Sequence, residues 1–184
     1  MQLPIIKTSR LILKPFQIDD SKSVHLLADD IKIASTTGTI PHPYKLSDAE
    51  SWINTHVDNW QKKNSLTLSV CLNEKNKIIG AIELILKLQH KRAELAYWIG
   101  FPFWNRGYCT EASKAIVSYG FNQLDLRKIT AHHMLSNPAS GKVMEKLGMK
   151  REGVFEQHFI RFGEFQDMAA YGVLRENFKC LELE

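Results

Sequence analysis

The sequence has few cysteines, no long apolar run and no large excess of one charge. Its three cysteines, Cys71, Cys109 and Cys180, are too few and too scattered for a disulfide framework or a zinc site. They suit a reducing cytoplasm. No apolar run approaches membrane-spanning length, and Met1–Lys7 lacks the pattern of a signal peptide. We therefore expect a cytoplasmic protein that does not enter a membrane.

Charge and composition exclude further classes of protein. The 24 basic residues exceed the 20 acidic ones by only four, and they are spread along the chain, so nucleic-acid binding is not indicated. The adjacent His132 and His133 would face opposite sides of a strand, which makes them poor joint metal ligands, and no metal is expected. With 184 residues, 44% of them hydrophobic, the chain suits a single domain over residues 1–184.

One stretch combines a strand, a turn and a helix. Glu94–Ile99 has the branched and aromatic residues of a strand. After a polar turn with Arg106 and Gly107, apolar residues recur with the period of a helix that buries one face: Ala112, Ala115, Ile116 and Tyr119. The first N–H groups of a helix have no internal partner, and glycine allows close approach to the backbone. This stretch therefore predicts an anion site.

Strands are expected on both sides of this motif. Leu66, Leu68, Val70 and Leu72 alternate, which indicates a half-buried strand. The other predicted strands are Arg10–Phe16, Ile78–Leu86, Arg92–Gly100, Arg127–Met134, Val154–Phe162 and Phe165–Leu174. The strands from Leu66 to Gly100 form an antiparallel meander, and the helical crossover makes Arg127–Met134 parallel to its predecessor.

Helices are expected before and after the meander. Asp19 or Asp20 would cap a short helix, and Ser47–Glu50 reads as a capping box. The helix after it would carry Trp52, Ile53, Val57 and Trp60 at helical spacing. Asn137 and Pro138 would open a later helix that buries Ser140, Val143, Met144 and Leu147 and ends at Gly148. The Gly- and Pro-containing segment Thr36–Tyr44 is predicted to be a loop.

Two motifs together resemble those of the GNAT acetyltransferase superfamily: Trp104–Ala112, and Asn137–Ser140 followed by Glu145–Met149. Within it, the sequence is most similar to the ribosomal-protein N-terminal acetyltransferases and their small-molecule relatives. The resemblance runs from Thr8 to about Leu174, a core of about residues 8–174. It implies an α/β (α+β) fold in which helices flank a mixed, mostly antiparallel sheet.

The resemblance also implies an acetyl-CoA site. A backbone edge would pair with the pantetheine arm, at Trp98, Ile99 and Gly100. The pyrophosphate would bind at Arg106, Gly107, Tyr108, Cys109 and Thr110. Asn137 would hold the pantetheine region, with Ser140 near the sulfur. The sequence departs from the usual anion motif at Trp104, Asn105 and Cys109. Cys109 is either a reactive thiol at a helix N-terminus or simply a small residue.

Two catalytic candidates follow from the resemblance. Many relatives place a tyrosine acid where this chain has Met144, so Ser140 becomes the candidate proton donor; its alternative is an ordinary first-turn serine. Glu94 matches a frequent position for a base that acts through water; its alternative is a solvent-facing charge. The glutamate used by the ribosomal-protein branch is replaced here by Phe159, beside His158.

The expected function is acetyl-CoA-dependent N-acetylation of a primary amine by direct attack in a ternary complex. The acceptor would be a protein N-terminus or a small molecule, and the protein a monomer or a homodimer. Thr36–Tyr44 would form one wall of the acceptor site, whereas Trp52 and Trp60 fit core packing better. The alternative from another class is a non-catalytic acyl-CoA-binding or regulatory domain.

Overall fold

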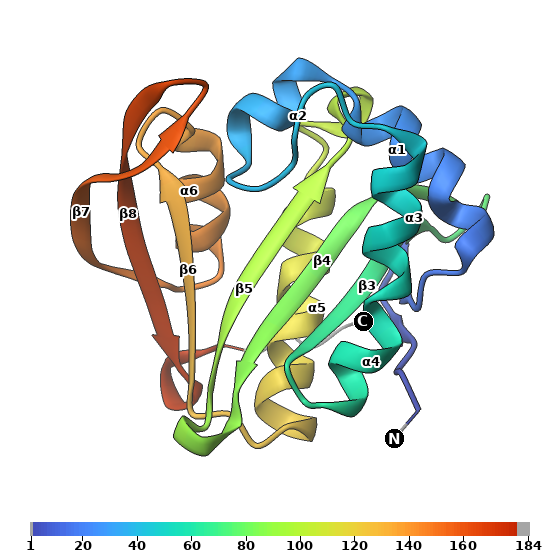
Figure 1. Cartoon of the computed structure of the whole chain (residues 1–184). Coiled ribbons are helices and arrows are strands. Elements are labelled where there is room, and N and C mark those ends of the chain that lie inside the picture. Colours follow the sequence, from blue (N-terminus) through green and yellow to red (C-terminus); the bar gives the residue numbers. More distant parts are fainter. Residues whose placement is uncertain (1, 180–184) are drawn as a thin grey trace.

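The computed structural model describes residues 2–179 and contains an eight-stranded sheet in the order β1-β2-β3-β4-β5-β6-β8-β7 (Figure 1). The strands are β1 (Ile6–Lys7), β2 (Leu11–Lys14), β3 (Ser65–Leu72), β4 (Lys77–Lys87), β5 (Arg92–Ile99), β6 (Lys128–Met134), β7 (Lys150–Arg161) and β8 (Glu164–Leu174). The helices are α1 (Ser21–Ala28), α2 (Ile31–Thr36), α3 (Leu46–Asn54), α4 (His56–Gln61), α5 (Tyr108–Gln123) and α6 (Pro138–Lys146). Single 3-10 turns occupy Ile18–Asp20, Leu88–His90, Phe101–Phe103 and Arg175–Asn177.

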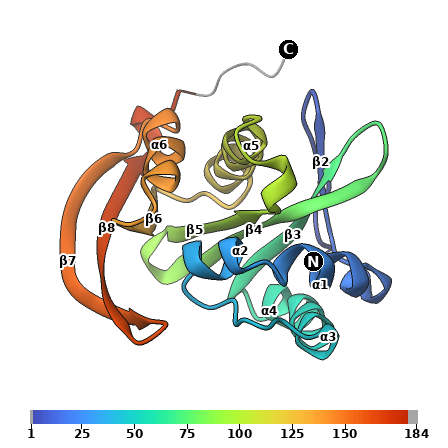
Figure 2. The same cartoon turned by 90° about the horizontal axis from the view of Figure 1, so that it is seen from above.

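The helices cover the sheet in two layers (Figure 2). Helices α1 to α4 lie on one face, which we call the front face, and α5 and α6 lie on the other, the back face. The meander of β3, β4 and β5 is antiparallel, and β6 is parallel to β5, as predicted. The expected fold class is thereby confirmed. No helix within residues 2–179 is long and apolar enough to cross a membrane.

Strands β5 and β6 pair over a short distance only. The parallel register joins Arg92 with Lys128, Ala93 with Ile129 and Glu94 with Thr130. Beyond this last pair the two strands diverge, and a gap between their ribbons widens toward the carboxyl ends (Figure 1). The sheet therefore consists of two parts, β1 to β5 and β6 to β8, that are joined through three residue pairs.

Two apolar clusters fill the spaces between the layers. The larger lies on the back face and includes Leu95 and Ile99 of β5 together with Ile116 of α5. The smaller lies on the front face, where Trp98 of β5 packs with residues of α1 and α3. Side chains alternate along a strand, so Ala93, Leu95, Tyr97 and Ile99 project backward while Glu94 and Trp98 project forward.

Strand β3 differs from the prediction of a half-buried strand. All of its residues from Ser65 to Cys71 are buried, because helices cover both faces of the sheet at this position. The residues between the leucines, Thr67, Ser69 and Cys71, are small or polar, and this produced the alternation read as a solvent-facing side. The hydroxyl of Thr67 donates to Glu83 Oε1 at 2.9 Å, which satisfies one buried polar group.

The predicted helix through Trp52 and Trp60 is two helices, α3 and α4, which meet at Thr55. As a result Val57 is 55% exposed instead of lying on an inner face. The predicted capping box is also displaced. Lys45 is the N-cap of α3, and the Asp48 carboxylate accepts from its N–H at 2.8 Å.

The first segments contain further differences. Strand β1 and helix α2 were not predicted, although the Asp30 carboxylate caps α2 by accepting from Lys32 N at 2.9 Å. Asp20 precedes α1, but its carboxylate accepts from Gln17 N instead of from the helix. The loop prediction holds from Thr37 onward, since Thr36 ends α2.

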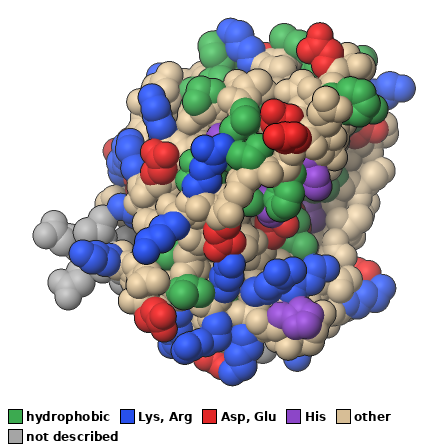
Figure 3. Space-filling view, turned by 90° about the vertical axis from the view of Figure 1, so that its left-hand side faces the viewer, with side chains coloured by type: hydrophobic (Ala, Val, Ile, Leu, Met, Phe, Trp, Pro, Cys, Tyr) green, Lys and Arg blue, Asp and Glu red, His purple; other side chains and the backbone are tan. Residues whose placement is uncertain are grey.

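The later elements agree with their predictions. Asn137 is the N-cap of α6 and Pro138 its first residue. Gly148 follows that helix with a φ of 74°, a left-handed conformation that glycine adopts without strain. Strands β7 and β8 form the closing hairpin. Strand β7 is exposed along nearly its whole length, and its face carries basic, acidic and hydrophobic side chains (Figure 3). Cys180 lies outside the described residues.

His56 is buried in an aromatic environment. Its ring lies 4.5 Å from that of Trp52 and 5.3 Å from that of Phe16, and the residue is 4% exposed. Neither ring nitrogen has a hydrogen-bond partner within the described part of the chain. Burial lowers the pKa of His56 to about 4, because an imidazolium would lose its hydration there.

This histidine should make the protein sensitive to acid. Between pH 6.5 and about pH 4, only the unfolded chain binds a proton at His56, so the free energy of unfolding should fall by about 3 kcal/mol as the pH falls through that window. We expect His56→Leu to flatten this dependence in urea denaturation measured from neutral to acidic pH. The exposed His90 supplies the control, His90→Leu, which should retain the wild-type profile. An unchanged acid slope in the His56 variant would contradict the assignment.

Candidate active site

The predicted strand, turn and helix form at the carboxyl end of β5. Gly107 is the N-cap of α5 with a φ of 78°, which an L side chain adopts only with strain. The first helical bond runs from Glu111 N to Gly107 O at 3.0 Å. The N–H groups of Tyr108, Cys109 and Thr110 precede that bond, so they have no acceptor within the helix. The end of this 16-residue helix can therefore bind an anion.

The two unusual residues before this turn have clear structural roles. Asn105 has a φ of 59°, in the left-handed region that asparagine tolerates better than most residues. Its presence where relatives have glycine is thus compatible with the turn. The indole Nε1 of Trp104 donates to Ile99 O at 2.5 Å, and its ring packs edge-on against Phe101. Trp104 therefore closes the turn against the end of β5.

Gly100 does not offer the free backbone edge that was expected. Its N–H donates to Ile79 O at 2.8 Å, and its carbonyl accepts from Phe103 N at 2.9 Å. The cause is the 3-10 turn that begins at Phe101 and draws the chain away from the strand direction. The Ile99 carbonyl is likewise engaged by Trp104. Pairing along this edge would have to use other backbone groups of β5 beyond Glu94.

A carboxylate in the first turn of α5 holds the anion turn in place. Glu111 accepts from Thr8 Oγ1 at 2.6 Å and from Arg10 N at 3.0 Å and Nε at 2.7 Å. Arg10 Nη1 also donates to the carbonyl of Arg106 at 3.1 Å, and the exposed Arg106 lies at the start of the turn. Burial alone would raise the pKa of Glu111, but the bonds from Thr8 and Arg10 outweigh it and hold that pKa below its usual range. The sequence did not reveal this link, because its partners are 101 to 103 positions apart.

The surroundings of Cys109 favour the small-residue alternative over the reactive thiol. Burial raises the pKa of the Cys109 thiol to about 12. The thiolate is the reactive form of cysteine, and a raised pKa disfavours it near neutral pH. Cys109 instead fills a small space beside the back-face cluster.

Ser140 has an unpredicted partner on β5. The hydroxyl of Tyr97 lies 2.9 Å from Ser140 Oγ and donates to the Ser140 carbonyl at 3.2 Å. Burial raises the pKa of Tyr97, which keeps the phenol protonated. Asn137 Oδ1 accepts from Ser140 N at 3.4 Å, so the N-cap orients the first turn of α6 that carries the serine. Two hydroxyl groups thus lie together on the back face.

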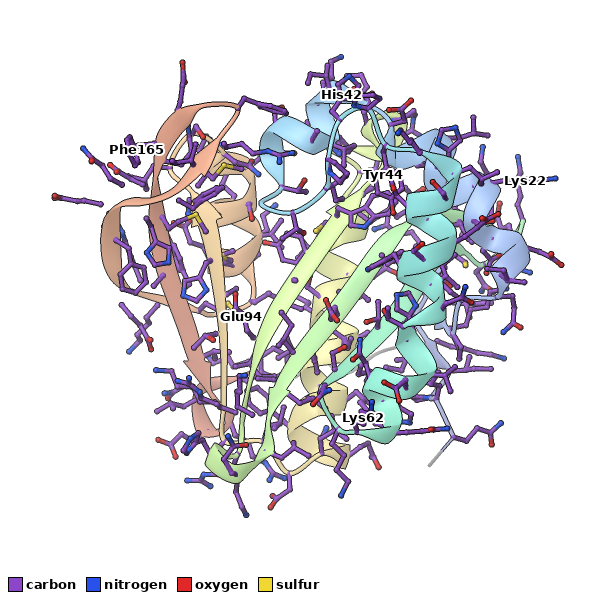
Figure 4. The ribbon with its side chains drawn as sticks, viewed as in Figure 1. Lys22, His42, Tyr44, Lys62, Glu94 and Phe165 are labelled. Atoms are coloured by element: carbon purple, nitrogen blue, oxygen red, sulfur yellow. The ribbon has the colours of Figure 1, made fainter. Side chains whose placement is uncertain are left out.

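Glu94 also has a partner that the sequence did not reveal. Its Oε1 lies 2.9 Å from Nδ1 of His132 on β6. The Glu94 side chain is 43% exposed and that of His132 28% exposed, so Glu94 is a paired carboxylate that remains accessible to solvent. Figure 4 shows Glu94 between the ribbons of β5 and β6. The expectation that His132 and His133 face opposite sides is met, since His133 is buried and bonds the Met134 carbonyl.

The candidate residues lie on both faces of the diverging strands. Ser140 and Tyr97 are on the back face with the N-termini of α5 and α6. Glu94 and His132 are on the front face. The structure therefore places Ser140 on the same face as the anion turn but on the opposite face from Glu94. The gap between β5 and β6 is the place where groups on the two faces can act on one molecule.

Hydrogen bonds join α2 and the segment after it to β7 and α6 across the open end of this gap, which we call its mouth. Arg161 of β7 donates from Nε to Ala34 O at 2.8 Å and from Nη2 to the Ile40 carbonyl. Asn137 Nδ2 donates to Thr36 O at 3.3 Å. The segment predicted to be an acceptor wall, Thr36–Tyr44, is thus held against β7 and α6. Trp60 is 4% exposed, which agrees with core packing.

Comparisons with known proteins agree with this geometry. Residues 10–150 match the family model described as Acetyltransferase (GNAT) domain. The chain belongs to the GNAT acetyltransferase family. It is an N-acetyltransferase. Among curated relatives, the uncharacterized N-acetyltransferase YnaD of Bacillus subtilis is 30% identical over 93% of this chain and 97% of its own length.

Two further relatives are informative. YdaF of Bacillus subtilis, a candidate ribosomal N-acetyltransferase, is 24% identical over 72% of this chain and 74% of its own. The structure of spermidine N-acetyltransferase from Vibrio cholerae, solved with CoA and spermine, has a TM-score of 0.80 at 26% identity. That alignment covers 92% of this chain and 98% of that chain.

Loss of the Glu111 carboxylate should loosen the anion turn and destabilise the protein. We expect Glu111→Gln to lower the free energy of unfolding by about 1–3 kcal/mol, because charge-assisted hydrogen bonds to two backbone segments are weakened. Urea denaturation would measure the change. The exposed Glu50 of α3 provides the control, and Glu50→Gln should change stability by less than about 0.5 kcal/mol. Equal stabilities of the two variants would contradict the linking role of Glu111.

Proposed function

We propose that this protein binds acetyl-CoA on its back face and transfers the acetyl group to a primary amine that enters from the front face. The observation that carries the proposal is the position of the β5–β6 gap. It opens beside the N-terminus of α5 on one side and beside the Glu94–His132 pair on the other. The amine nitrogen would attack the thioester carbonyl directly in a ternary complex.

The residues of the anion turn fit the pyrophosphate of acetyl-CoA. The free N–H groups of Tyr108, Cys109 and Thr110 would bind it, and Arg106 would add positive charge. Gly107 leaves open the space that a side chain would occupy: a Cβ there would meet only Arg10 Nη2, at 3.4 Å. Backbone groups of Trp98 and Ile99 and the side chain of Asn137 would guide the pantetheine arm. The named V. cholerae relative was solved with CoA.

Ser140 would protonate the departing thiolate. As a first-turn residue of α6 it lies beside the gap, and its Oγ lies 2.9 Å from the Tyr97 hydroxyl, a contact in which either group can be the donor. Met144 cannot donate a proton, so the hydroxyl groups of Ser140 and Tyr97 are the candidates on this face. A thiol has a pKa of about 8.5, which means that expelling a thiolate near neutral pH needs only modest help.

The acceptor class is a primary amine. The named relatives point to two forms of it, the N-terminus of a ribosomal protein and a polyamine. An α-amino group has a pKa of about 8, against about 10.4 for a lysine-like amine, so it is easier to deprotonate by ~3 kcal/mol. Release of CoA from acetyl-CoA should be measured with peptides bearing free N-termini, spermidine and single amino acids. Release no faster than without an amine would overturn the proposal.

Gly107 supplies a test of the cofactor site. Gly107→Val should weaken acetyl-CoA binding at least ~10-fold, because the side chain strains the turn and blocks close approach of phosphate. Gly107→Asn separates these causes, since asparagine accepts the left-handed conformation but still adds bulk. Calorimetric titration of folded variants would decide. Wild-type affinity in both variants would remove the turn from the cofactor site.

Ser140 supplies a test of leaving-group protonation. Ser140→Ala should lower kcat by about 10- to 1,000-fold, and Tyr97→Phe by a smaller factor of about 10, while acetyl-CoA affinity stays near wild type. The losses should not add in the double variant, because the hydroxyl groups act as one unit. Ser51→Ala, on the exposed surface of α3, is the control. Full activity of Ser140→Ala on the best acceptor would show that solvent protonates the departing thiolate.

A further inference from the structure

Glu94 and His132 meet at the point where the two parts of the sheet separate. Glu94 belongs to the last residue pair between β5 and β6, opposite Thr130. His132 is two residues beyond Thr130, so it projects from the same face of β6. The 2.9 Å contact between Glu94 Oε1 and His132 Nδ1 therefore spans the base of the gap on the front face. This is the face opposite to the Ser140–Tyr97 pair.

The hydrogen bond assigns different tasks to the two side chains. An ionised carboxylate can only accept a hydrogen bond. Nδ1 of His132 must therefore be the protonated nitrogen, and it donates to Glu94. In the neutral ring, Nε2 then holds the free lone pair. The carboxylate is already occupied by this bond. We propose that His132 Nε2, with Glu94 as its positioning residue, accepts the proton of the attacking amine.

The surroundings of the pair are consistent with this assignment. The bond from His132 outweighs burial and, with Arg92 and Lys87 nearby, lowers the pKa of Glu94, which makes its carboxylate a weaker base. The bond to Glu94 outweighs burial and raises the pKa of His132 above its ordinary 6.5. A base is most effective when its pKa lies near the working pH.

Strand β7 completes the surroundings of His132. The ring of Phe155 lies 6.0 Å from the ring of His132, and the ring of His158 stacks on Phe155 at 4.9 Å. Glu152, which also pairs with Lys128 at 2.7 Å, adds negative charge that raises the pKa of His132 further. These side chains come from β7, which pairs with β8 at the edge of the sheet and still brings the ring of Phe155 next to the imidazole.

The atoms and electrons of the proposed step are all accounted for, and the step depends on the proposed function above. The amine R–NH₂ forms a C–N bond with the thioester carbonyl carbon, and its proton passes to His132 Nε2, directly or through one water. The C–S bond then breaks with its electron pair on sulfur, and Ser140 protonates the thiolate. The products are R–NH–acetyl and CoA–SH. His132 afterwards releases its proton to solvent, and Ser140 regains a proton from solvent, so both side chains return to their starting states.

Asparagine separates the two tasks, because its side-chain amide can replace Nδ1 but supplies no base at Nε2. His132→Asn should lower kcat by about 10²–10⁴-fold with acetyl-CoA affinity unchanged. Glu94→Gln should cost less, about 10- to 100-fold, and should move the acidic limb of the kcat/KM profile to lower pH, since the imidazolium loses its carboxylate. His90→Asn, on the 3-10 turn Leu88–His90, is the matched control. A Glu94→Gln variant that is less active than His132→Asn, or whose acidic limb does not move, would overturn the proposal.

A second measurement does not depend on the acceptor. Nitrogen NMR of the full chain, labelled with ¹⁵N, should show His132 with its proton on Nδ1 and a pKa above 6.5 that falls in Glu94→Gln. The Nε2–H tautomer, or a pKa indifferent to Glu94, would overturn the proposal. Calorimetry of the wild type with acetyl-CoA tests the proposed function separately. If no amine in the panel is acetylated, the proposed function fails; if an amine is acetylated and His132→Asn keeps the wild-type rate, only the catalytic assignment of His132 fails.

Discussion

Three residue pairs between β5 and β6 determine how the rest of this protein can work. Both strands run parallel from Arg92–Lys128 to Glu94–Thr130 and then separate. An ordinary parallel pair continued along both strands would close the sheet and leave one continuous face on each side. The separation instead exposes backbone of β5 at its carboxyl end. It also brings the N-termini of α5 and α6 to the same opening, because each helix begins just after the strand that forms one side of it.

Side-chain alternation then divides the chemistry between the two faces. Tyr97 and Glu94 are three positions apart on β5, so they project to opposite sides. Each meets a partner from the second part of the sheet: Ser140 after β6 on the back face, and His132 within β6 on the front face. In the proposed mechanism, the hydroxyl groups protonate the leaving group on one face and the carboxylate–imidazole pair takes the proton of the amine on the other. A slip of β5 by one residue would exchange these faces.

Much of this arrangement could be predicted from local sequence signals. The branched and aromatic residues of β5, the glycine of the anion turn and the N-cap Asn137 each act within a few residues, and the structure contains the elements they predicted. The break at Thr55 was not predictable in this way, because Trp52, Ile53 and Trp60 keep a helical spacing through it. The burial of β3 on two sides likewise depends on helices that are distant in the sequence.

The hydrogen-bond partners of the candidate residues were harder to predict from the sequence. Glu94 and Ser140 were chosen as single residues by resemblance, whereas their partners His132 and Tyr97 depend on the register of β6 and on the placement of α6. The same holds for Glu111, whose carboxylate meets residues about a hundred positions earlier. The sequence pattern around Asn105 looked like a departure from the family, but the left-handed conformation there is one that asparagine and glycine share.

The two parts of the sheet are connected again at the opposite end of the gap. Arg161 of the second part donates to the carbonyls of Ala34 in α2 and of Ile40, in the front-face segment that packs on the first part, and Asn137 donates to the Thr36 carbonyl. The opening on the front face is therefore bounded at its base by Glu94 and His132 and at its mouth by these bonds. In all of these hydrogen bonds the acceptor is a backbone carbonyl. They therefore hold the backbone of this front-face segment in place whatever its side chains are. If the segment is the acceptor wall proposed for it, the side chains of Thr36–Tyr44 can vary to suit an acceptor while these backbone contacts keep its path.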